Sequence, residues 1–283
     1  SYALMQHSLA EERVQIAREL LDAARARVEA GEASGLELMK TEVQLAAAEN
    51  DLTDRQIRVD EARYRLFNQM GISPGEEGYH LEFPDTLHFF PVTFEEDAVL
   101  DGLKQMPRLL AAANRQNAAR WDNRTAWSSA LLPDLEVSLF RQDFGSGYDY
   151  YGFEAGVKIP LWFWLNDQGK IRASRAVLHR RNGELQQEER SLLEAAEGAW
   201  HRFKASKITL ARYRDTIRDK SKTLFRLTAE GYRLGETDLL TLLDAQRLYL
   251  DSQDRYYQAL YQYDVALIEL EIFLGQEMIF TGE

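Results

Sequence analysis

Apolar residues recur at spacings of three and four along two stretches at the start of the chain. The first stretch covers about residues 2 to 30 and the second about residues 36 to 70, where Gly71 ends it. This spacing places apolar side chains on one face of an α-helix. Gly31 and Gly35 lie between the stretches and provide the backbone freedom that a tight turn needs. The pattern predicts an antiparallel helical hairpin.

The turn and the helix after it occur twice. Residues 31–36 (GEASGL) have a counterpart in residues 235–240 (GETDLL), and Gly275 closes the second copy as Gly71 closes the first. The large residues that recur every seventh position in the two copies are Leu38, Leu45, Leu52, Val59 and Leu66, and then Leu242, Tyr249, Tyr256, Tyr263 and Leu270. Mostly small residues follow three positions later, which is typical of a coiled-coil seam. We infer an internal duplication, whose second copy has a long helix over about 170–234 and a return helix over 239–274.

From Pro133 the pattern changes to a period of two. Two runs of alternating apolar and polar or small residues flank a glycine-rich segment, residues 145–149. This predicts a β-hairpin, preceded by a helix over about 97–131 that is interrupted near Pro107. Folding the chain about Gly147 predicts that Glu136 lies opposite Lys158 as a favourable charge pair.

One face of the predicted hairpin is apolar. Its residues are Leu135, Val137, Leu139, Tyr151, Phe153, Ala155, Val157 and Ile159. An isolated hairpin is not stable in water, and each run is long enough to cross a bilayer when tilted. We therefore expect this face to contact lipid, with Trp162, Phe163 and Trp164 at the membrane interface. Since open strand edges are not tolerated in lipid, several chains would share one barrel. The alternative is a two-stranded flap on a soluble helical bundle.

Composition excludes several classes of function. The net charge of −12 argues against a nucleic-acid-binding protein. The chain has no cysteine, and its five histidines form no pair with the spacing of helical metal ligands. We therefore expect no enzyme activity, no metal site and no cofactor. Because Ser1 opens inside a helical pattern, we also expect the natural chain to continue upstream, by on the order of a hundred residues if the duplication is complete.

These patterns divide the chain into six predicted parts. They are a first-repeat helical hairpin (1–70), an irregular connector (71–96), a helix (97–132), a transmembrane β-hairpin (133–162), a second-repeat long helix with its helical hairpin (163–275) and a tail (276–283).

Several segments together resemble the TolC family of outer-membrane efflux proteins. The most specific are residues 231–240 (GYRLGETDLL) followed by 243–247 (LDAQR), and 266–270 (ALIEL) before Gly275. Residues 160–169 (PLWFWLNDQG) resemble the family's exit from its second membrane hairpin. The resemblance covers the whole chain.

The resemblance implies a mainly α fold with a membrane β-hairpin. Each chain of a homotrimer would give four strands to a shared twelve-stranded β-barrel, while long antiparallel coiled-coil helices form an α-barrel through the periplasm. Such a channel lies in the outer membrane of a Gram-negative cell and passively exports small molecules or metal cations. Its partners are a periplasmic adaptor (membrane fusion protein) and an inner-membrane pump of the RND or ABC type.

The resemblance also implies site residues. The expected adaptor-docking tips are Gly31, Gly35, Leu36, Gly235, Thr237, Asp238, Leu239 and Leu240. Asp244 matches an acidic position at the pore constriction, and Thr241 stands where some family members carry a second aspartate. Without the family, Asp244 would be interpreted as an exposed carboxylate on a helix. Glu37 and Glu42 are interpreted as solvated flanks of the coiled coil, and the tyrosines of the second heptad series as packing residues with hydrated hydroxyls.

Two questions stay open at this level. Residues 166–171 (NDQGKI) resemble the heavy-metal cation efflux branch, but multidrug export fits the sequence almost as well. The alternative to a channel is a soluble periplasmic coiled-coil scaffold or adaptor, which explains the heptads and leaves the amphipathic hairpin unexplained.

Overall fold

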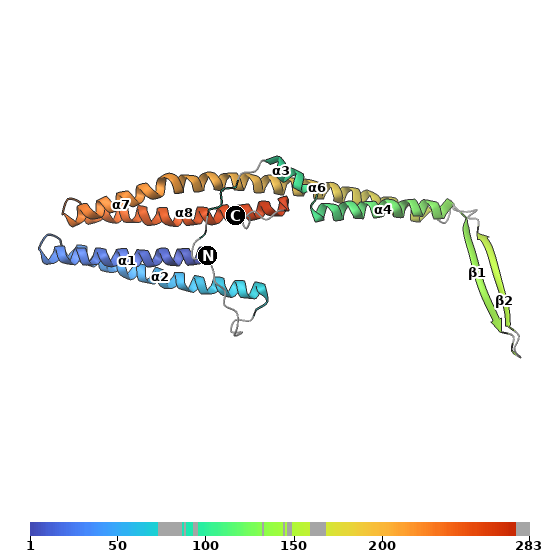
Figure 1. Ribbon diagram of the computed structural model, residues 1–283, viewed down its shortest axis with the longest axis horizontal. Helices are drawn as coiled ribbons and strands as arrows, with labels where there is room; N and C mark the ends of the chain where they lie inside the picture. Colours follow the sequence, from blue (N-terminus) through green and yellow to red (C-terminus); the bar gives the residue numbers. More distant parts are fainter. Residues whose placement is uncertain are drawn as a thin grey trace. The chain divides into compact units, whose positions relative to one another are not determined.

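The computed structural model describes residues 1–72, 87, 89–92, 96–131, 133–143, 145, 149–158 and 168–275, and these are mainly helical (Figure 1). The chain divides into two compact units. The first contains Ser1–Phe94 and Ala199–Ile272, and the second contains Glu95–Gly198 and Phe273–Gly275.

The first unit is built from two helical hairpins. Helices α1 (Tyr2–Glu29) and α2 (Gly35–Met70) form one, and α7 (Arg218–Arg233) and α8 (Leu239–Leu274) form the other (Figure 1). Both hairpins were expected from the heptads and the glycine turns, and the structure confirms them.

The long helix expected over about 170–234 is interrupted once. It consists of α6 (Gln168–Arg212), a π-helical turn η1 (Tyr213–Ile217) and α7. A π-turn inserts extra backbone into an α-helix without breaking it. No glycine or proline marks this position in the sequence, so the interruption could not be predicted from helix breakers.

Apolar contacts inside the first unit follow the predicted seams. Val14 and Ala17 of α1 pack on Ala48 of α2, next to the half-buried Leu45 and Leu52. In α8 the large heptad residues Leu242, Tyr249, Tyr263 and Leu270 are buried, and Tyr256 is half-buried. In α2, by contrast, the buried residues are Thr41, Ala48 and Val59. The seam of the first copy therefore closes mainly on small side chains.

The second unit contains α3 (Glu96–Leu103), α4 (Pro107–Leu131), the first part of α6 and the strands β1 (Asp134–Asp143) and β2 (Asp149–Lys158). The predicted interruption near Pro107 is confirmed, because Pro107 is the first residue of α4, where its missing N–H costs no hydrogen bond. Helices α4 and α6 pair through polar contacts: Gln116 Nε2 donates to Asn182 Oδ1 at 2.9 Å, and Ser174 Oγ to Asn123 Oδ1 at 3.0 Å.

The two strands form the predicted antiparallel hairpin, but in a different register. Glu136 lies opposite Gly156, and Lys158 lies opposite Asp134, so the prediction that Glu136 and Lys158 lie directly opposite each other is wrong. Pairing continues closer to the turn, as far as Asp143 and Asp149, and an ion pair of 2.5 Å between Arg141 Nη2 and Asp149 Oδ2 supports this register. The shift is two residues, so every side chain keeps its predicted face.

Candidate functional site

The two expected tips have the same backbone geometry. Gly31 (φ 75°) ends the α1 turn, and Gly235 (φ 76°) ends the α7 turn. In the first tip, N–H groups of Gly31 and Glu32 donate to Val28 O and Arg27 O; in the second, those of Gly235 and Glu236 donate to Tyr232 O and Gly231 O. These paired bonds are the C-terminal capping motif that needs a left-handed residue, and glycine takes that conformation most easily.

The second tip has additional fastenings. Asp238 Oδ1 accepts a hydrogen bond of 2.8 Å from the Thr241 N–H and caps α8. Hydrogen bonding from the side chain of Thr241, and then from its backbone N–H, stabilises the charged carboxylate and holds the pKa of Asp238 below its ordinary value. Thr237 Oγ1 donates to Thr228 O at 3.1 Å, and Gly231 lies so close that an added Cβ would be 3.1 Å from Thr237 Cγ2.

The remaining expected tip residues differ in exposure. Leu36 and Leu240 are 61% and 62% exposed, and Gly35 is the first residue of α2. Leu239 is instead 4% exposed and packs in a cluster with Leu20, Tyr232 and Leu242. Leu36 and Leu240 are therefore accessible at the surface of the tips, while Leu239 is part of the core of the second tip.

A tyrosine that sequence analysis did not assign links the two tips. The hydroxyl of Tyr232 in α7 donates to Glu37 Oε2 in α2 at 3.2 Å. Arg27 of α1 donates to the Tyr232 carbonyl oxygen at 3.3 Å, and its guanidinium lies 4.6 Å from the tyrosine ring centroid. Glu37 is thus not merely a solvated flank residue. The signal was available, because Tyr232 lies inside the motif at residues 231–240.

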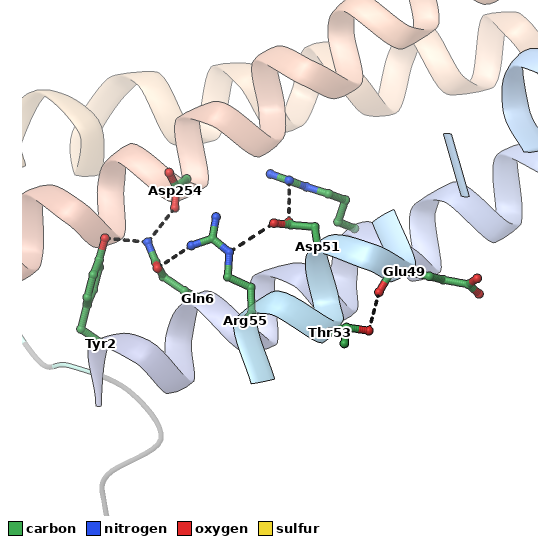
Figure 2. A network of polar contacts seen from close by, with 8 residues as sticks. Tyr2, Gln6, Glu49, Asp51, Thr53, Arg55 and Asp254 are labelled. Atoms are coloured by element: carbon green, nitrogen blue, oxygen red, sulfur yellow. Dashed lines mark hydrogen bonds and ion pairs between the residues drawn. The ribbon is translucent and has the colours of Figure 1, made fainter. Parts of the chain in front are cut away.

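The two hairpins also meet through polar side chains further along (Figure 2). Gln6 Nε2 donates to Tyr2 Oη at 2.6 Å and to Asp254 Oδ1 of α8 at 3.1 Å, and its Oε1 accepts from Arg55 Nη1 at 2.6 Å. Asp51 accepts from Arg55 at 3.4 Å and from Arg13 at 2.8 Å. One amide side chain therefore joins α1, α2 and α8.

Two further bonds follow the same interface. Tyr249 Oη donates to Glu12 Oε1 at 2.6 Å, and Gln44 Nε2 donates to Gln246 Oε1 at 2.8 Å. Burial, and then Glu12, raise the pKa of Tyr249 above its ordinary value. The Tyr263 hydroxyl donates to Phe90 O at 2.7 Å. The expectation of hydrated hydroxyls is thus wrong for Tyr249 and Tyr263.

The two expected constriction residues, Asp244 and Thr241, are exposed on α8. Asp244 lines a groove of about 540 Å³ together with Leu240, Arg13, Gln44 and Arg247. The groove lies between α8 and the first hairpin, and it carries charges of both signs.

The expected lipid-facing side chains that the structure describes share one face of the strand pair. Leu135 lies opposite Val157, Val137 opposite Ala155, and Leu139 opposite Phe153. All of these side chains are exposed, with exposed fractions between 59% and 85% for the six larger ones. The six are Leu135, Val137, Leu139, Tyr151, Phe153 and Val157, and Ala155 is exposed as well. Ile159, Trp162, Phe163 and Trp164 lie outside the described residues. On the other face, Phe140 covers Gly152, where an added Cβ would collide with the ring.

The described residues contain no group of three or more histidine, aspartate or glutamate side chains that could hold a metal ion. Among the helices that the structure describes, none combines the length and the apolar character needed to span a bilayer.

The solved structures to which the chain is similar include outer-membrane channels. The structure of the outer-membrane channel OprN matches this chain with a TM-score of 0.78 at 20% identity, and the match covers 98% of this chain and 64% of the OprN chain. The outer membrane protein VceC of Vibrio cholerae matches 97% of this chain, over 66% of its own, with a TM-score of 0.79 at 16% identity. At these identities the likeness shows the fold, which is that of a TolC-like channel protein.

Sequence relatives agree. The pyoverdine export outer membrane protein OpmQ of Pseudomonas putida is 29% identical over 157 residues, which is 51% of this chain and 32% of OpmQ. The outer membrane efflux protein BepC of Brucella suis is 24% identical over 252 residues, which is 84% of this chain and 52% of BepC. The chain thus spans about half or less of these relatives' lengths. A family model described as "Outer membrane efflux protein" matches residues 101–276, more than half of the chain. The chain therefore belongs to the outer membrane efflux protein family.

Proposed function

We propose that the protein is the outer-membrane channel subunit of a tripartite efflux system. It exports small molecules or metal cations passively to the cell exterior, and it carries out no chemistry on them. The observation that carries this proposal is the strand hairpin, one face of which carries exposed apolar side chains from Leu135 to Leu139 and from Tyr151 to Val157. Such a face is unfavourable in water and matches the lipid-facing side of a membrane strand.

The channel would be a homotrimer. Two strands cannot close a barrel, and open strand edges are not tolerated in lipid, so strands from several chains would complete it. Exposed apolar stripes on two helices of the first unit support this assembly. They consist of Met39, Val43, Ile57 and Tyr64 on α2, and of Tyr261, Val265, Ile268 and Ile272 on α8. Their spacings of three, four, seven and fourteen residues keep them on one face of each helix and fit packing against a neighbouring helix.

The tips would bind a periplasmic adaptor, which connects the channel to an inner-membrane pump of the RND or ABC type. Leu36 and Leu240 offer exposed apolar contacts beside the two glycine turns. The ties from Tyr232 to Glu37 and to Arg27 hold the two tips together, and adaptor binding would favour the state in which they separate. Asp244 would face the pore near this point and set a preference for cations.

The class of substrate stays as broad as the relatives indicate. OpmQ is named for pyoverdine export and BepC for efflux. In the segment of this chain that resembles the heavy-metal branch, residues 166–171, the first two residues lie outside the described ones and the other four begin α6. A helix start does not distinguish one class of substrate from another. We therefore propose the passive export duct without choosing between metal cations and organic compounds.

A membrane-insertion and conductance experiment tests this proposal. The full-length protein is expressed in a Gram-negative host, recovered from the outer-membrane fraction and added to a planar lipid bilayer. We expect a trimer in native gels and discrete conductance steps. Quantitative recovery in the soluble periplasmic fraction, without conductance, would contradict the proposal and favour a soluble coiled-coil scaffold.

A further inference from the structure

A strongly basic surface lies on the helices next to the strand hairpin. The chain carries a net charge of −12, yet residues 117–131 of α4 and 168–183 of α6 contain seven arginines and lysines and a single acid, Asp122. The cations in this region are Arg120, Arg124, Lys170, Arg172, Arg175, Arg180 and Arg181. A local positive charge on a protein with a net negative charge suggests that this surface binds an anionic partner.

Four of these arginines lie on one side of the helix pair. On α4, Arg120 and Arg124 are one turn apart and share a face with Trp127. On α6, Arg172 and Arg175 share a face in the same way. The Arg175 guanidinium lies 6.0 Å from the centroid of the Trp127 ring, so the two faces adjoin. We call Arg120, Arg124, Arg172 and Arg175 the basic face.

The basic face is accessible and unneutralised as far as the structure is described. All four arginines are exposed. Within the described ranges, no ion pair joins any of them to an acidic side chain; Arg180 and Arg181, by contrast, pair with Glu184 at 3.5 Å and 2.6 Å. Among the residues that the structure describes, Arg172 donates to the neutral Gln168, at 3.3 Å. Guanidinium groups in this state are ready to bind phosphate in a bidentate manner.

Two exposed tryptophans accompany the arginines. Trp121 is 64% exposed, with the Arg124 guanidinium 5.0 Å from its ring centroid, and Trp127 is 39% exposed. Exposed indoles beside cations are unusual on a surface that meets only water, but they are typical of the boundary between lipid and water.

The position along the chain fits that boundary. Helix α4 ends at Leu131, and β1 begins at Asp134. Arg124 is two helical turns before the end of α4, which is about 10 Å at roughly 1.5 Å per residue. The headgroup layer on each side of a bilayer is about 5 to 8 Å thick. If the hairpin spans the hydrocarbon core, Arg124 begins just outside this layer and Arg120 about one turn farther away, and their long side chains can extend toward the lipid phosphates. Arg172 is the fifth residue of α6, about 6 Å from the end of that helix that follows the hairpin.

We propose that the basic face binds the phosphate groups of anionic phospholipids in the membrane leaflet where the hairpin begins. This inference rests on the proposed membrane insertion of the hairpin. Each arginine would contribute electrostatic attraction and phosphate hydrogen bonds, and the tryptophans would fix the depth of the protein in the leaflet.

The test measures lipid retention by the full-length trimer. The protein in detergent is titrated with phosphatidylglycerol or with phosphatidylcholine, and bound lipids are counted by native mass spectrometry. We expect preferential retention of phosphatidylglycerol. The variant with Arg120→Gln, Arg124→Gln, Arg172→Gln and Arg175→Gln should bind it about tenfold or more weakly, since each basic residue near an anionic surface contributes substantially.

Two further variants control for charge and folding. Arg58→Gln, Arg63→Gln, Lys220→Gln and Lys222→Gln together remove four exposed cations from the first unit and should leave the lipid preference unchanged. Lysine at the four positions of the basic face should restore most of the binding. A neutralised variant that retains phosphatidylglycerol like the original protein overturns the inference.

Other outcomes separate this inference from the proposed function. A shift in ion selectivity with unchanged lipid retention would place the basic face in the pore and overturn the lipid assignment alone. A protein that neither floats with vesicles nor conducts ions would overturn the membrane insertion, and the lipid assignment with it.

Discussion

The hydroxyl of Tyr232 in α7 donates a hydrogen bond to the carboxylate of Glu37 in α2, 3.2 Å away, and so connects residues from the two copies of the repeat. The tyrosine has 0% exposure, and burial raises its pKa. A single hydroxyl is thus placed where separation of the tips would have to break it.

We predict that Tyr232→Phe makes the resting channel leak. The substitution keeps the packed ring and removes a bond to a charged acceptor, which contributes about 1.5 to 3 kcal/mol. The open probability of the full-length protein in a planar bilayer should rise several-fold. Tyr64→Phe, at an exposed position on α2, is the control. A resting conductance equal in both variants would show that the Tyr232–Glu37 hydrogen bond does not keep the tips closed.

Asp244→Asn should reduce the preference for cations, because it removes one exposed carboxylate per chain from the predicted constriction. The measurement is the reversal potential across a salt gradient, together with blockage by multivalent cations. Asp219→Asn, a surface carboxylate on α7, controls for the loss of charge. If ion preference and blockage are unchanged in Asp244→Asn, the Asp244 side chain does not face the pore.

Leu240→Asp should impair export while the trimer still assembles. The side chain is 62% exposed, so the substitution disturbs no core of the single chain, but it puts a charge into the proposed docking surface. Export is measured as substrate resistance in a strain that lacks its own channel, and assembly by native gel. Asp at the buried neighbour Leu239 is expected to destabilise the tip itself, which separates docking from folding. Normal export by Leu240→Asp would argue against tip docking.

Asp264 predicts a pH dependence of stability. Burial raises its pKa to about 6, and its Oδ1 is shielded from solvent without a hydrogen bond among the described residues. A raised pKa means that the folded state favours the protonated acid, so this contribution is present below the unfolded value near 4 and is lost as pH rises through about 6. The side chain is partly exposed, so water screening reduces the effect to roughly 1 kcal/mol.

The stability of Asp264→Asn relative to the original protein should therefore increase as the pH rises from 4 to 8. At pH 8 the variant should have the higher Tm. Asp251→Asn, an exposed carboxylate on the same helix, controls for the removal of one charge. A stability difference that stays constant with pH would contradict the assignment.

Two glycine substitutions should act in opposite directions. Gly235→Ala forces a side chain into a φ of 76°, which costs about 1 kcal/mol. Gly183→Ala lies inside α6 with open space around the new Cβ, and it should stabilise the helix by roughly 0.5 to 1 kcal/mol. Thermal unfolding of both variants, beside the original protein, measures the two signs. A neutral Gly235→Ala would show that the tip turn tolerates another conformation.

The sequence predicts the elements of this fold well because each has a local signal. Heptads, glycine turns, Pro107 and the period-two runs are all local, and the corresponding helices and strands are present. Alternation did not predict the strand register, because a shift of two residues leaves every side chain on the same face. The π-turn was missed since no residue type specifies it.

The candidate site was predictable in part. Sequence alone cannot tell which of two adjacent leucines is buried, and only packing separates Leu239 from Leu240. The bonds that Tyr232, Tyr249 and Tyr263 make with residues far away in the sequence depend on how the hairpins meet. The tertiary structure was therefore needed to distinguish residues exposed at the tips, residues that hydrogen-bond the two hairpins together and residues of the core.

The π-turn at Tyr213–Ile217 determines how this segment should respond to the deletion of one residue. A π-turn behaves like the insertion of one residue into an α-helix, and one residue of an α-helix corresponds to a rotation of about 100°. Deleting a single codon there would let α6 and α7 join as one regular helix. All side chains on one side of the deletion would then turn away from their present neighbours, so residues 199–212 of α6 and helix α7 could not both keep their present packing inside the first unit. Length variation in this segment should be tolerated poorly, even though it lies in the middle of a helix and its side chains are not buried.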